Sequence, residues 1–348
     1  MCTRTSLTFL IIISAITFVR CSSEDSVSHD VPHAPLFCIA TADNRFGTLE
    51  HQVAATKTMR ELNALWNKSV DGSGSDLTSS PVGVHTLAAF LNKRYALQHG
   101  LPFFLSNHSN ASFYPGVAAR PYIRHPAWEK IGYLRTLLAS QPQCTWFLWL
   151  DSDAYLWMQS QRVSLLTFAQ RVSVHEFTHG FGDIDARRTT NGALSFDSRS
   201  FAIGLNGYEN GTPGERRGFP RPPGTPHHVC SGIFFVSNTP AGAALLADWD
   251  GPEGNNTSFS SMSTNQSKAE HDLWYTWANK FPWEQAVLGL HVLPKHRTQI
   301  IIYSFLELND AEGPFIRHLW SALRRRPDSP HLKAMWLTTR QLFQSDTV

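Results

Sequence analysis

Short runs of consecutive apolar residues alternate along the chain with longer stretches whose apolar residues recur at helical spacing. Continuous apolar runs are typical of strands that are buried on both faces. The runs are LFCIAT (36–41), PFFL (102–105), TWFLWL (145–150), IFFVS (233–237) and IIIYSF (300–305). Helical spacing marks residues 85–99, 128–138 and 241–249. This alternation predicts an α/β fold, in which a mostly parallel sheet carries helices on both faces.

The ends of the chain differ in composition from its middle. An uncharged, mainly apolar run from Leu7 to Val19 follows Arg4. It is shorter than the roughly 20 residues that span a bilayer, so residues 1–21 are predicted to be a signal peptide or a short signal anchor. We expect a short stem over residues 22–34, a single domain over residues 35–340 and a tail over residues 341–348. The Gly- and Pro-rich segment 206–226 predicts a surface loop or lid.

Charge and glycosylation sequences narrow the possible partners. The 30 basic and 28 acidic residues give a net charge of +2, whereas a nucleic-acid binder needs a strongly basic face. We therefore expect no nucleic-acid partner. Seven Asn-x-Ser/Thr sequences agree with entry into the secretory lumen. They begin at Asn67, Asn107, Asn110, Asn210, Asn255, Asn256 and Asn265.

The spacing of the cysteines indicates neither a metal site nor a particular disulfide pairing. Of five cysteines, Cys2 and Cys21 lie in the targeting segment, and Cys38, Cys144 and Cys230 each adjoin an apolar run. No Cys-x-x-Cys spacing occurs. We interpret the last three as buried, small apolar side chains, among which one disulfide is possible but its pairing is not specified.

A His-Glu-x-x-His sequence suggests one metal site. If residues 175–179 were helical, His175, His179 and Asp185 would hold zinc and Glu176 would activate water, as in a metallopeptidase. The helix would have to run through Val174 and two glycines, and no convincing Met-turn follows. The histidines could instead lie on the surface near a helix end or form a buried, hydrogen-bonded pair. A secreted zinc metallopeptidase is therefore kept as an alternative.

A second candidate site is Asp151-Ser152-Asp153. Two other Asp-x-Asp sequences occur, at 183–185 and 248–250, but only this one directly follows a strand-like run. Ligands of parallel sheets bind at the carboxyl ends of the strands. Two carboxylates there suit Mn²⁺ or Mg²⁺, which can bridge the phosphates of a nucleotide diphosphate. The alternative is that Asp151 caps a helix and Asp153 is solvated.

Five segments in order, covering most of residues 91–320, carry a resemblance to a known family. They are LNKRYALQHG (91–100), HPAWEKIGYLRTLLASQPQCTWFLWLDSDAYL (125–156), CSGIFFVSNTPAGAALLADW (230–249), PWEQAVL (282–288) and GPFIRHLW (313–320). Together they resemble GT-A glycosyltransferases that include fungal α-galactosyltransferases and plant xyloglucan xylosyltransferases. The segment from Cys38 to Asn44 is compatible with a nucleotide-binding first strand.

The resemblance implies a GT-A, Rossmann-like catalytic domain over residues 35–340 and assigns a metal site to it. Asp153 would bind Mn²⁺ or Mg²⁺, Asp151 would bind the metal or the nucleotide ribose, and Ser152 would lie at the donor. His318 would be the third protein ligand of the metal. The alternative for His318 is a core histidine whose hydrogen bonds are satisfied.

The resemblance also implies roles around the reacting sugar. Glu284 and Gln285 would face that sugar, although a glutamate at a helix start is also favoured by the helix dipole. Lys130 would lie at the donor unless it only occupies the polar face of its helix. Ser231 and Gly232 would contact substrate, because the acceptor strand has to pass close to a ligand.

The chain departs from the family pattern after His318. The family's Lys, which reaches the diphosphate, is replaced here by Leu323, and Arg324 is a possible substitute. The Asn that often precedes the glycine at position 232 is missing as well. These departures leave the donor sugar open.

The resemblance predicts a metal-dependent, retaining glycosyltransferase. Its donor would be a UDP-sugar, with galactose or xylose as the sugar most expected, and its acceptor would be a glycan hydroxyl. We expect a single-pass type II protein of the Golgi membrane with a luminal catalytic domain, or otherwise a protein of the secretory lumen or a secreted one. Besides the peptidase, a catalytically inactive relative with the same fold is a further alternative.

Overall fold

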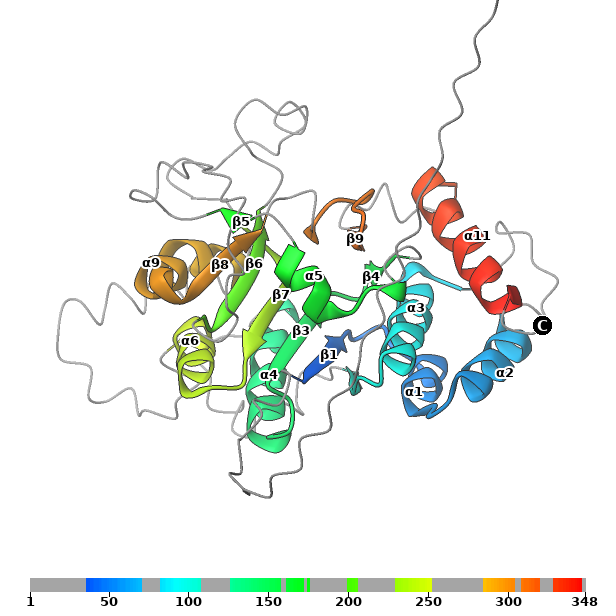
Figure 1. Ribbon diagram of the computed structural model, residues 1–348, viewed down its shortest axis with the longest axis horizontal. Coiled ribbons are helices and arrows are strands. Elements are labelled where there is room, and N and C mark those ends of the chain that lie inside the picture. Colours follow the sequence, from blue (N-terminus) through cyan, green and yellow to red (C-terminus); the bar gives the residue numbers. More distant parts are fainter. Residues whose placement is uncertain are drawn as a thin grey trace, which may run out of the picture. The chain divides into compact units, whose positions relative to one another are not determined.

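A computed structural model describes most of the predicted catalytic domain. The described residues are 36–70, 82–107, 126–157, 161–171, 174–175, 199–205, 229–251, 284–303, 308–319 and 328–345. They form a single α/β domain (Figure 1). The expected leader, the stem and the segment 206–226 lie outside these residues. No helix of the described part is both long and apolar enough to cross a membrane.

A seven-stranded sheet forms the centre of the domain. In spatial order its strands are β2 (Phe103–Ser106), β1 (Phe37–Ala42), β3 (Trp146–Leu150), β7 (Val229–Ser237), β6 (Phe201–Leu205), β8 (Ile300–Tyr303) and β5 (Val174–His175). Their pairings make five strands run in one direction, whereas β7 and β5 run in the opposite one. The predicted mostly parallel sheet is confirmed, with an antiparallel strand at its centre that the apolar pattern did not indicate.

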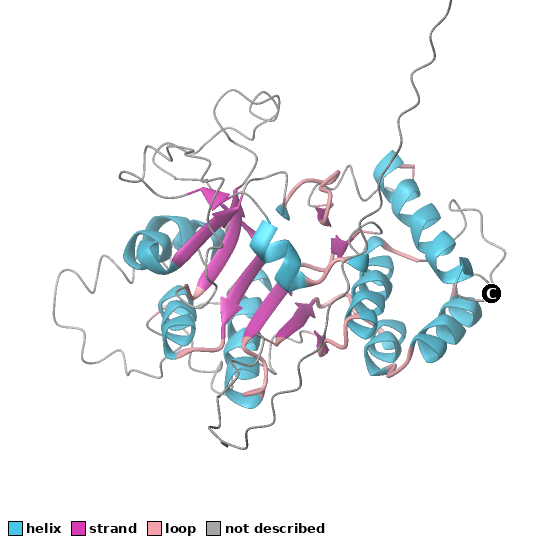
Figure 2. Cartoon of the chain, in the orientation of Figure 1, coloured by secondary structure: helices cyan, strands magenta, loops and turns pink. Residues whose placement is uncertain are grey.

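Helices cover both faces of this sheet, as predicted (Figure 2). Their bounds are α1 (Thr48–Ala55), α2 (Met59–Ser69), α3 (Val84–Gln98), α4 (Glu129–Ser140), α5 (Leu165–Arg171), α6 (Pro240–Asp250), α8 (Glu284–Val287), α9 (Leu293–His296) and α11 (Pro330–Ser345). A π-helical turn, Leu288–Val292, joins α8 to α9. On one face, Phe147 and Trp149 of β3 share a core with α4 and α6. On the other, Trp146 and Leu148 share a core with α3 and α5.

A third core holds α2, α3 and α11 together beside the sheet (Figure 1). Trp66 stacks on Phe343 with ring centroids 4.7 Å apart and meets Phe90 edge-on at 5.2 Å. Helix α11 continues to Ser345, past the boundary predicted at residue 340, and Phe343 is fully buried. Residues 341–345 are therefore part of α11, and Phe343 belongs to this core.

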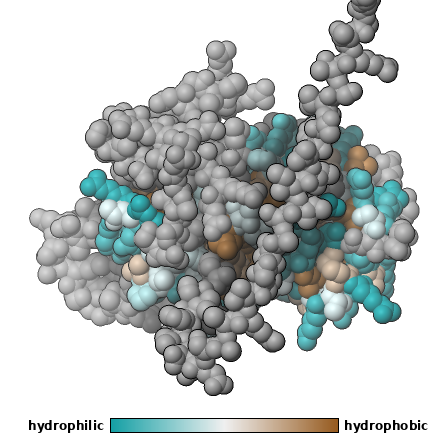
Figure 3. Space-filling view, in the orientation of Figure 1, coloured by the Kyte–Doolittle hydropathy of each residue, from teal (hydrophilic) through white to brown (hydrophobic). Residues whose placement is uncertain are grey.

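The visible described surface is mainly hydrophilic (Figure 3). Among the described residues, Leu337 is the one large hydrophobic side chain that is strongly exposed. The glycosylation sequences at Asn67 and Asn107 begin at exposed residues. The other five lie outside the described residues.

A disulfide links Cys38 of β1 to Cys144, two residues before β3, with Cα atoms 5.8 Å apart. Pairing of β1 with β3 brings the two cysteines together, which spacing alone did not reveal. Cys230 is the buried cysteine without a disulfide in the described part. All three cysteines are buried, as predicted, and the one disulfide that the sequence left possible is formed by Cys38 and Cys144.

The double variant Cys38→Ala, Cys144→Ala is expected to be less stable by about 4 kcal/mol, because the disulfide closes a long loop in the unfolded chain. The two cysteines are 106 residues apart. Urea unfolding with and without dithiothreitol tests this. The reductant should shift the wild-type transition and leave the variant unchanged; equal stability of the oxidised wild type and the variant would contradict it.

Candidate metal and donor site

Asp151, Ser152 and Asp153 form a tight turn at the carboxyl end of β3. The Asp151 amide donates to the Gly232 carbonyl of the neighbouring strand β7 at 2.8 Å, which extends the sheet by one residue. The Ala154 amide donates to the Asp151 carbonyl at 2.8 Å and closes the turn. The predicted position of these carboxylates at a strand end is confirmed.

A small second sheet brings His318 to this turn. Strand β4 (Ala154–Leu156) pairs antiparallel with β9 (Ile316–His318), so that Ala154 lies opposite His318. The Leu319 amide donates to the Asp153 carbonyl at 3.0 Å. On the other edge of β4, Asn92 of α3 donates to the Ala154 carbonyl and accepts from the Leu156 amide, each at 3.0 Å. Asn92, Asp153 and His318, which are far apart in the chain, are thereby held close to one another.

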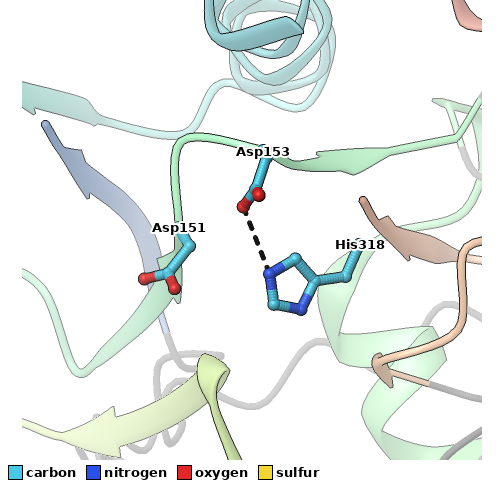
Figure 4. Close-up of side chains that lie close together, drawn as sticks. All are labelled: Asp151, Asp153 and His318. Atoms are coloured by element: carbon cyan, nitrogen blue, oxygen red, sulfur yellow. Dashed lines mark ion pairs between the residues drawn. The ribbon is translucent and has the colours of Figure 1, made fainter. Parts of the chain in front are cut away.

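Asp151, Asp153 and His318 form one possible metal-binding group. One ligand atom of each lies within 4.8 Å of the others, and they are the one such group among the described residues. Asp153 and His318 point toward each other (Figure 4), with 3.2 Å between Oδ1 and Nε2. Two carboxylates and an imidazole form a donor set that suits Mn²⁺ or Mg²⁺. These residues therefore fit the ion that the resemblance implies.

His318 is held firmly in its position. Burial disfavours its charged form, but the Asp153 carboxylate outweighs burial and raises the pKa of His318 to about 10. The Cys230 sulfur lies 3.8 Å from Nδ1, and Gly232 lies directly against the ring. An imidazole must lose its proton to bind a metal through Nε2, so an ion would replace the ion pair with Asp153.

Gly232→Ala is expected to lower Mn²⁺ affinity by about 10- to 100-fold, the size seen when a metal ligand loses its support. A Cβ at position 232 would lie 2.1 Å from Cε1 of His318, so the ring would have to move. Electron paramagnetic resonance of free Mn²⁺ measures the affinity. Gly47→Ala is the control, because a Cβ there meets nothing closer than 3.6 Å. Equal Mn²⁺ binding by both variants would contradict the expectation.

A buried lysine connects the turn to helix α8. Lys130 Nζ contacts Asp151 Oδ1 at 3.0 Å, Glu284 Oε1 at 3.1 Å and the Ser231 carbonyl at 3.0 Å. Burial disfavours its charge, but the two carboxylates outweigh burial and raise the pKa of Lys130. Trp149 Nε1 donates to the same Asp151 oxygen at 2.8 Å. This cluster fixes Asp151 and Glu284 relative to each other.

Ser231 of strand β7 completes the arrangement on the α8 side. Its hydroxyl donates to Glu284 Oε1 at 2.7 Å, and its amide donates to Gln285 Oε1 at 3.4 Å. Glu284 is buried, and its carbonyl accepts from Trp249 Nε1 at 2.8 Å. The residues predicted to contact substrate therefore lie beside the predicted catalytic pair.

Comparison with known proteins gives this geometry a context. Among solved structures, a glycosyltransferase involved in the glycosylation of the major capsid of PBCV-1 is similar, with a TM-score of 0.43 and 13% sequence identity. The similarity covers 86% of this chain and 99% of that one. Among curated proteins we found no match. The model of the galactosyl transferase GMA12/MNN10 family matches residues 74–168.

The chain is a glycosyltransferase, and its residues 74–168 are similar to this family. The matched region includes α3, with Asn92, and the turn that carries Asp151 and Asp153. The predicted resemblance and the predicted enzyme class are confirmed. His318, Glu284 and Gln285 lie beyond the matched residues, so their assignment depends on the geometry described above.

The structure describes only part of the predicted zinc-peptidase motif, and it does not describe Arg324. Val174 and His175 form strand β5, paired with β8, so a helix that includes His175 is wrong for the glycosyltransferase. Glu176, His179 and Asp185 lie outside the described residues, as does Arg324.

From the sequence, the segment from Cys38 to Asn44 was named as a possible nucleotide-binding strand, but Asp43 and Arg45 were assigned no role. Asp43 and Arg45 follow β1, and both contact the Ser152 hydroxyl, Arg45 Nη2 at 2.8 Å. Burial opposes the charge of Asp43, but hydrogen bonds from Arg45 and Ser152 hold the pKa of Asp43 below its usual value. The signal was present, because both residues directly follow a buried strand that is parallel to β3. Donor sites lie at such strand ends.

Glu129→Gln is expected to stabilise the glycosyltransferase at pH 8 but not at pH 5. Burial raises the pKa of Glu129 to about 7. The folded protein therefore binds this proton more tightly than the unfolded chain, and it loses stability as the pH rises from about 4.5 through 7. Glutamine removes the loss, which is worth on the order of 1 kcal/mol per pKa unit. Urea unfolding at both pH values measures it; an equal effect at both would contradict the prediction.

Proposed function

We propose that this glycosyltransferase uses Mn²⁺ or Mg²⁺ to transfer a sugar from a UDP-sugar to a glycan hydroxyl. Galactose and xylose are the proposed sugars. The supporting observation is that Asp151, Asp153 and His318 converge at the carboxyl end of β3. The ion would be held by these three residues and would neutralise charge on the departing diphosphate.

The family resemblance implies transfer with retention, and the protein groups around the triad bear on how retention would be achieved. Glu284 Oε1 is occupied by Lys130 and Ser231, so this carboxylate is held in place and is poorly suited to swing into a covalent bond with the sugar. Gln285, next to it, carries an amide that can hydrogen-bond a sugar hydroxyl. We infer a front-face reaction, in which the acceptor attacks from the side on which the diphosphate leaves, without a covalent intermediate.

We infer a luminal location, in the Golgi membrane as a type II protein or otherwise as a secreted protein. The apolar run from Leu7 to Val19 supports entry into the secretory pathway. The exposed glycosylation sequences at Asn67 and Asn107 are consistent with it. The disulfide between Cys38 and Cys144 is of the kind that persists in oxidising compartments.

The decisive experiment incubates the purified full-length protein with a panel of UDP- and GDP-sugars, with Mn²⁺, with Mg²⁺ or with EDTA. We expect hydrolysis of one UDP-sugar, loss of this hydrolysis in EDTA, and an α-linked product when a matching glycan is supplied. Turnover that persists in EDTA would refute metal dependence. A GDP-sugar as the only donor would refute the UDP specificity.

The same panel separates the alternatives. A catalytically inactive relative would bind and turn over no nucleotide sugar under any condition. A zinc peptidase would instead cleave a peptide library in the presence of Zn²⁺, and Glu176→Ala would abolish this cleavage. The proposed glycosyltransferase should keep its donor turnover in Glu176→Ala.

A further inference from the structure

The loop after β1 reaches the same edge of the sheet as the candidate metal turn. Strands β1 and β3 are neighbours and parallel, with Ala40 opposite Trp149. The loop that follows Ala42 is therefore adjacent to the turn that follows Leu150. The Ser152 hydroxyl, from the middle of this turn, joins the Asp43 carboxylate and the Arg45 guanidinium.

This loop is fixed by contacts on both sides of Arg45. The Asp43 amide donates to the Ser106 carbonyl at 3.1 Å, and the Phe46 amide donates to the Asp43 carbonyl at 3.3 Å. Phe46 is 2% exposed, and its carbonyl accepts from Asn107 Nδ2 at 2.8 Å. A cation on such a loop is already ordered before a ligand arrives, which lowers the entropic cost of binding.

Arg45 has hydrogen-bond donors to spare. Nε donates to Asp43 Oδ1 at 2.7 Å, and Nη2 donates to Asp43 Oδ2 at 2.5 Å and to Ser152 Oγ at 2.8 Å. A guanidinium carries five N–H groups. Within the described part of the chain Nη1 makes no hydrogen bond, and 48% of the Arg45 side chain is exposed. Nε and Nη2 of the guanidinium are therefore anchored, and Nη1 is left to bind a further group.

Lys130, the other cation at this edge, is occupied differently. Its three donors are directed at Asp151, Glu284 and the Ser231 carbonyl, and its side chain is only 6% exposed. A further anion would have to displace one of these buried partners. Arg45 can accept an anion without losing any contact.

We propose that Arg45 binds the phosphate groups of the donor's nucleoside diphosphate through Nη1, with Asp43 as the residue that positions it. This inference rests on the proposed function, because it names the phosphate contact of that same donor site. Leu323 stands where the family resemblance leads one to expect a lysine for this task. The guanidinium fork matches the oxygen geometry of a phosphate group.

The test compares wild type with Arg45→Gln in the full-length protein. We expect the donor KM and the inhibition constant of UDP to rise by about 10- to 100-fold, as for the loss of a charge-assisted hydrogen bond. The inhibition constant of uridine, which lacks phosphates, and the affinity for Mn²⁺ should each change by less than about threefold. Arg45→Lys keeps the charge but not the forked guanidinium, so its donor KM and UDP inhibition constant should lie between those of wild type and Arg45→Gln. Lys295→Gln, the removal of an exposed cation paired with Asp248, is the control and should match wild type.

The possible results are distinct. Unchanged UDP inhibition in Arg45→Gln overturns the phosphate contact and leaves the proposed function intact. Equal losses for UDP and uridine also overturn it, because Arg45 would then only support the Ser152 turn. A wild-type protein that binds neither UDP nor any UDP-sugar refutes the proposed function itself. If Arg45→Gln does not fold, the UDP-to-uridine ratio in Arg45→Lys decides between the same outcomes.

Discussion

Asp153→Asn is expected to lower glycosyl transfer by on the order of 10³-fold and to abolish tight Mn²⁺ binding. A metal ion acting as a Lewis acid stabilises the departing charge by several kcal/mol, and each 1.36 kcal/mol is a factor of ten in rate. Asp153 faces His318 at 3.2 Å and is largely buried, so an amide there removes one anionic ligand without changing the shape of the site. Donor hydrolysis and Mn²⁺ titration give the two readouts.

The control for this substitution is Asp248→Asn. Asp248 belongs to another Asp-x-Asp sequence and is paired with Lys295 and His296 on α9. Its replacement should reduce stability slightly and leave kcat and Mn²⁺ affinity within about threefold of wild type, as for a partly exposed ion pair. Full activity of Asp153→Asn in the presence of Mn²⁺ would show that the metal site is assigned to the wrong residues.

Lys130→Met is expected to destabilise the folded protein by about 3–5 kcal/mol, the usual cost of removing one partner of a buried ion pair. The side chains of Lys130 and Glu284 are 6% and 4% exposed, so the Glu284 carboxylate would be left buried without its cation. Asp151 would lose the same partner. We therefore expect donor turnover to fall together with the midpoint of urea unfolding.

A second substitution separates charge from packing. In the double variant Lys130→Met, Glu284→Gln, the buried carboxylate is neutral, and part of the lost stability should return while turnover stays low. Lys57→Met, at an exposed position before α2, controls for the loss of a lysine. The single variant Glu284→Gln is measured as well. If the loss of unfolding free energy in the double variant equals the sum of the losses in Lys130→Met and Glu284→Gln, the ion pair is not the source of the effect.

The elements that were predicted best are those whose own residues determine them. Strands β1, β3 and β8 are continuous apolar runs, and α3, α4 and α6 have apolar residues at helical spacing. The direction of β7 and the existence of β4 and β9 were not predicted, since three-residue strands are defined by their partner and not by their own pattern. The same reason explains why His175 is in a strand, paired with Ile302, although the His-Glu-x-x-His motif is helical in peptidases.

The residues of the candidate site were also predicted only in part. The strand-end position identified Asp151 and Asp153, and the family resemblance identified His318, but no local pattern connects residues on β3 and β9. Asp43 and Arg45 were given no role, although Asp43 lies in the segment named as a possible nucleotide-binding strand, because their contact with Ser152 comes from the pairing of β1 with β3. The pairing of Cys38 with Cys144 depends on this same adjacency.

The pairing of β4 with β9 has a consequence for the synthesis of the protein. It joins Asp153 to a histidine 165 residues later (318 minus 153), and contacts of such separation form late because a long loop must close first. A nascent chain that ends before β9 carries the two aspartates but not the imidazole. His318 is therefore added only after most of the polypeptide has been synthesised, so an incomplete translation product does not have the whole candidate metal site.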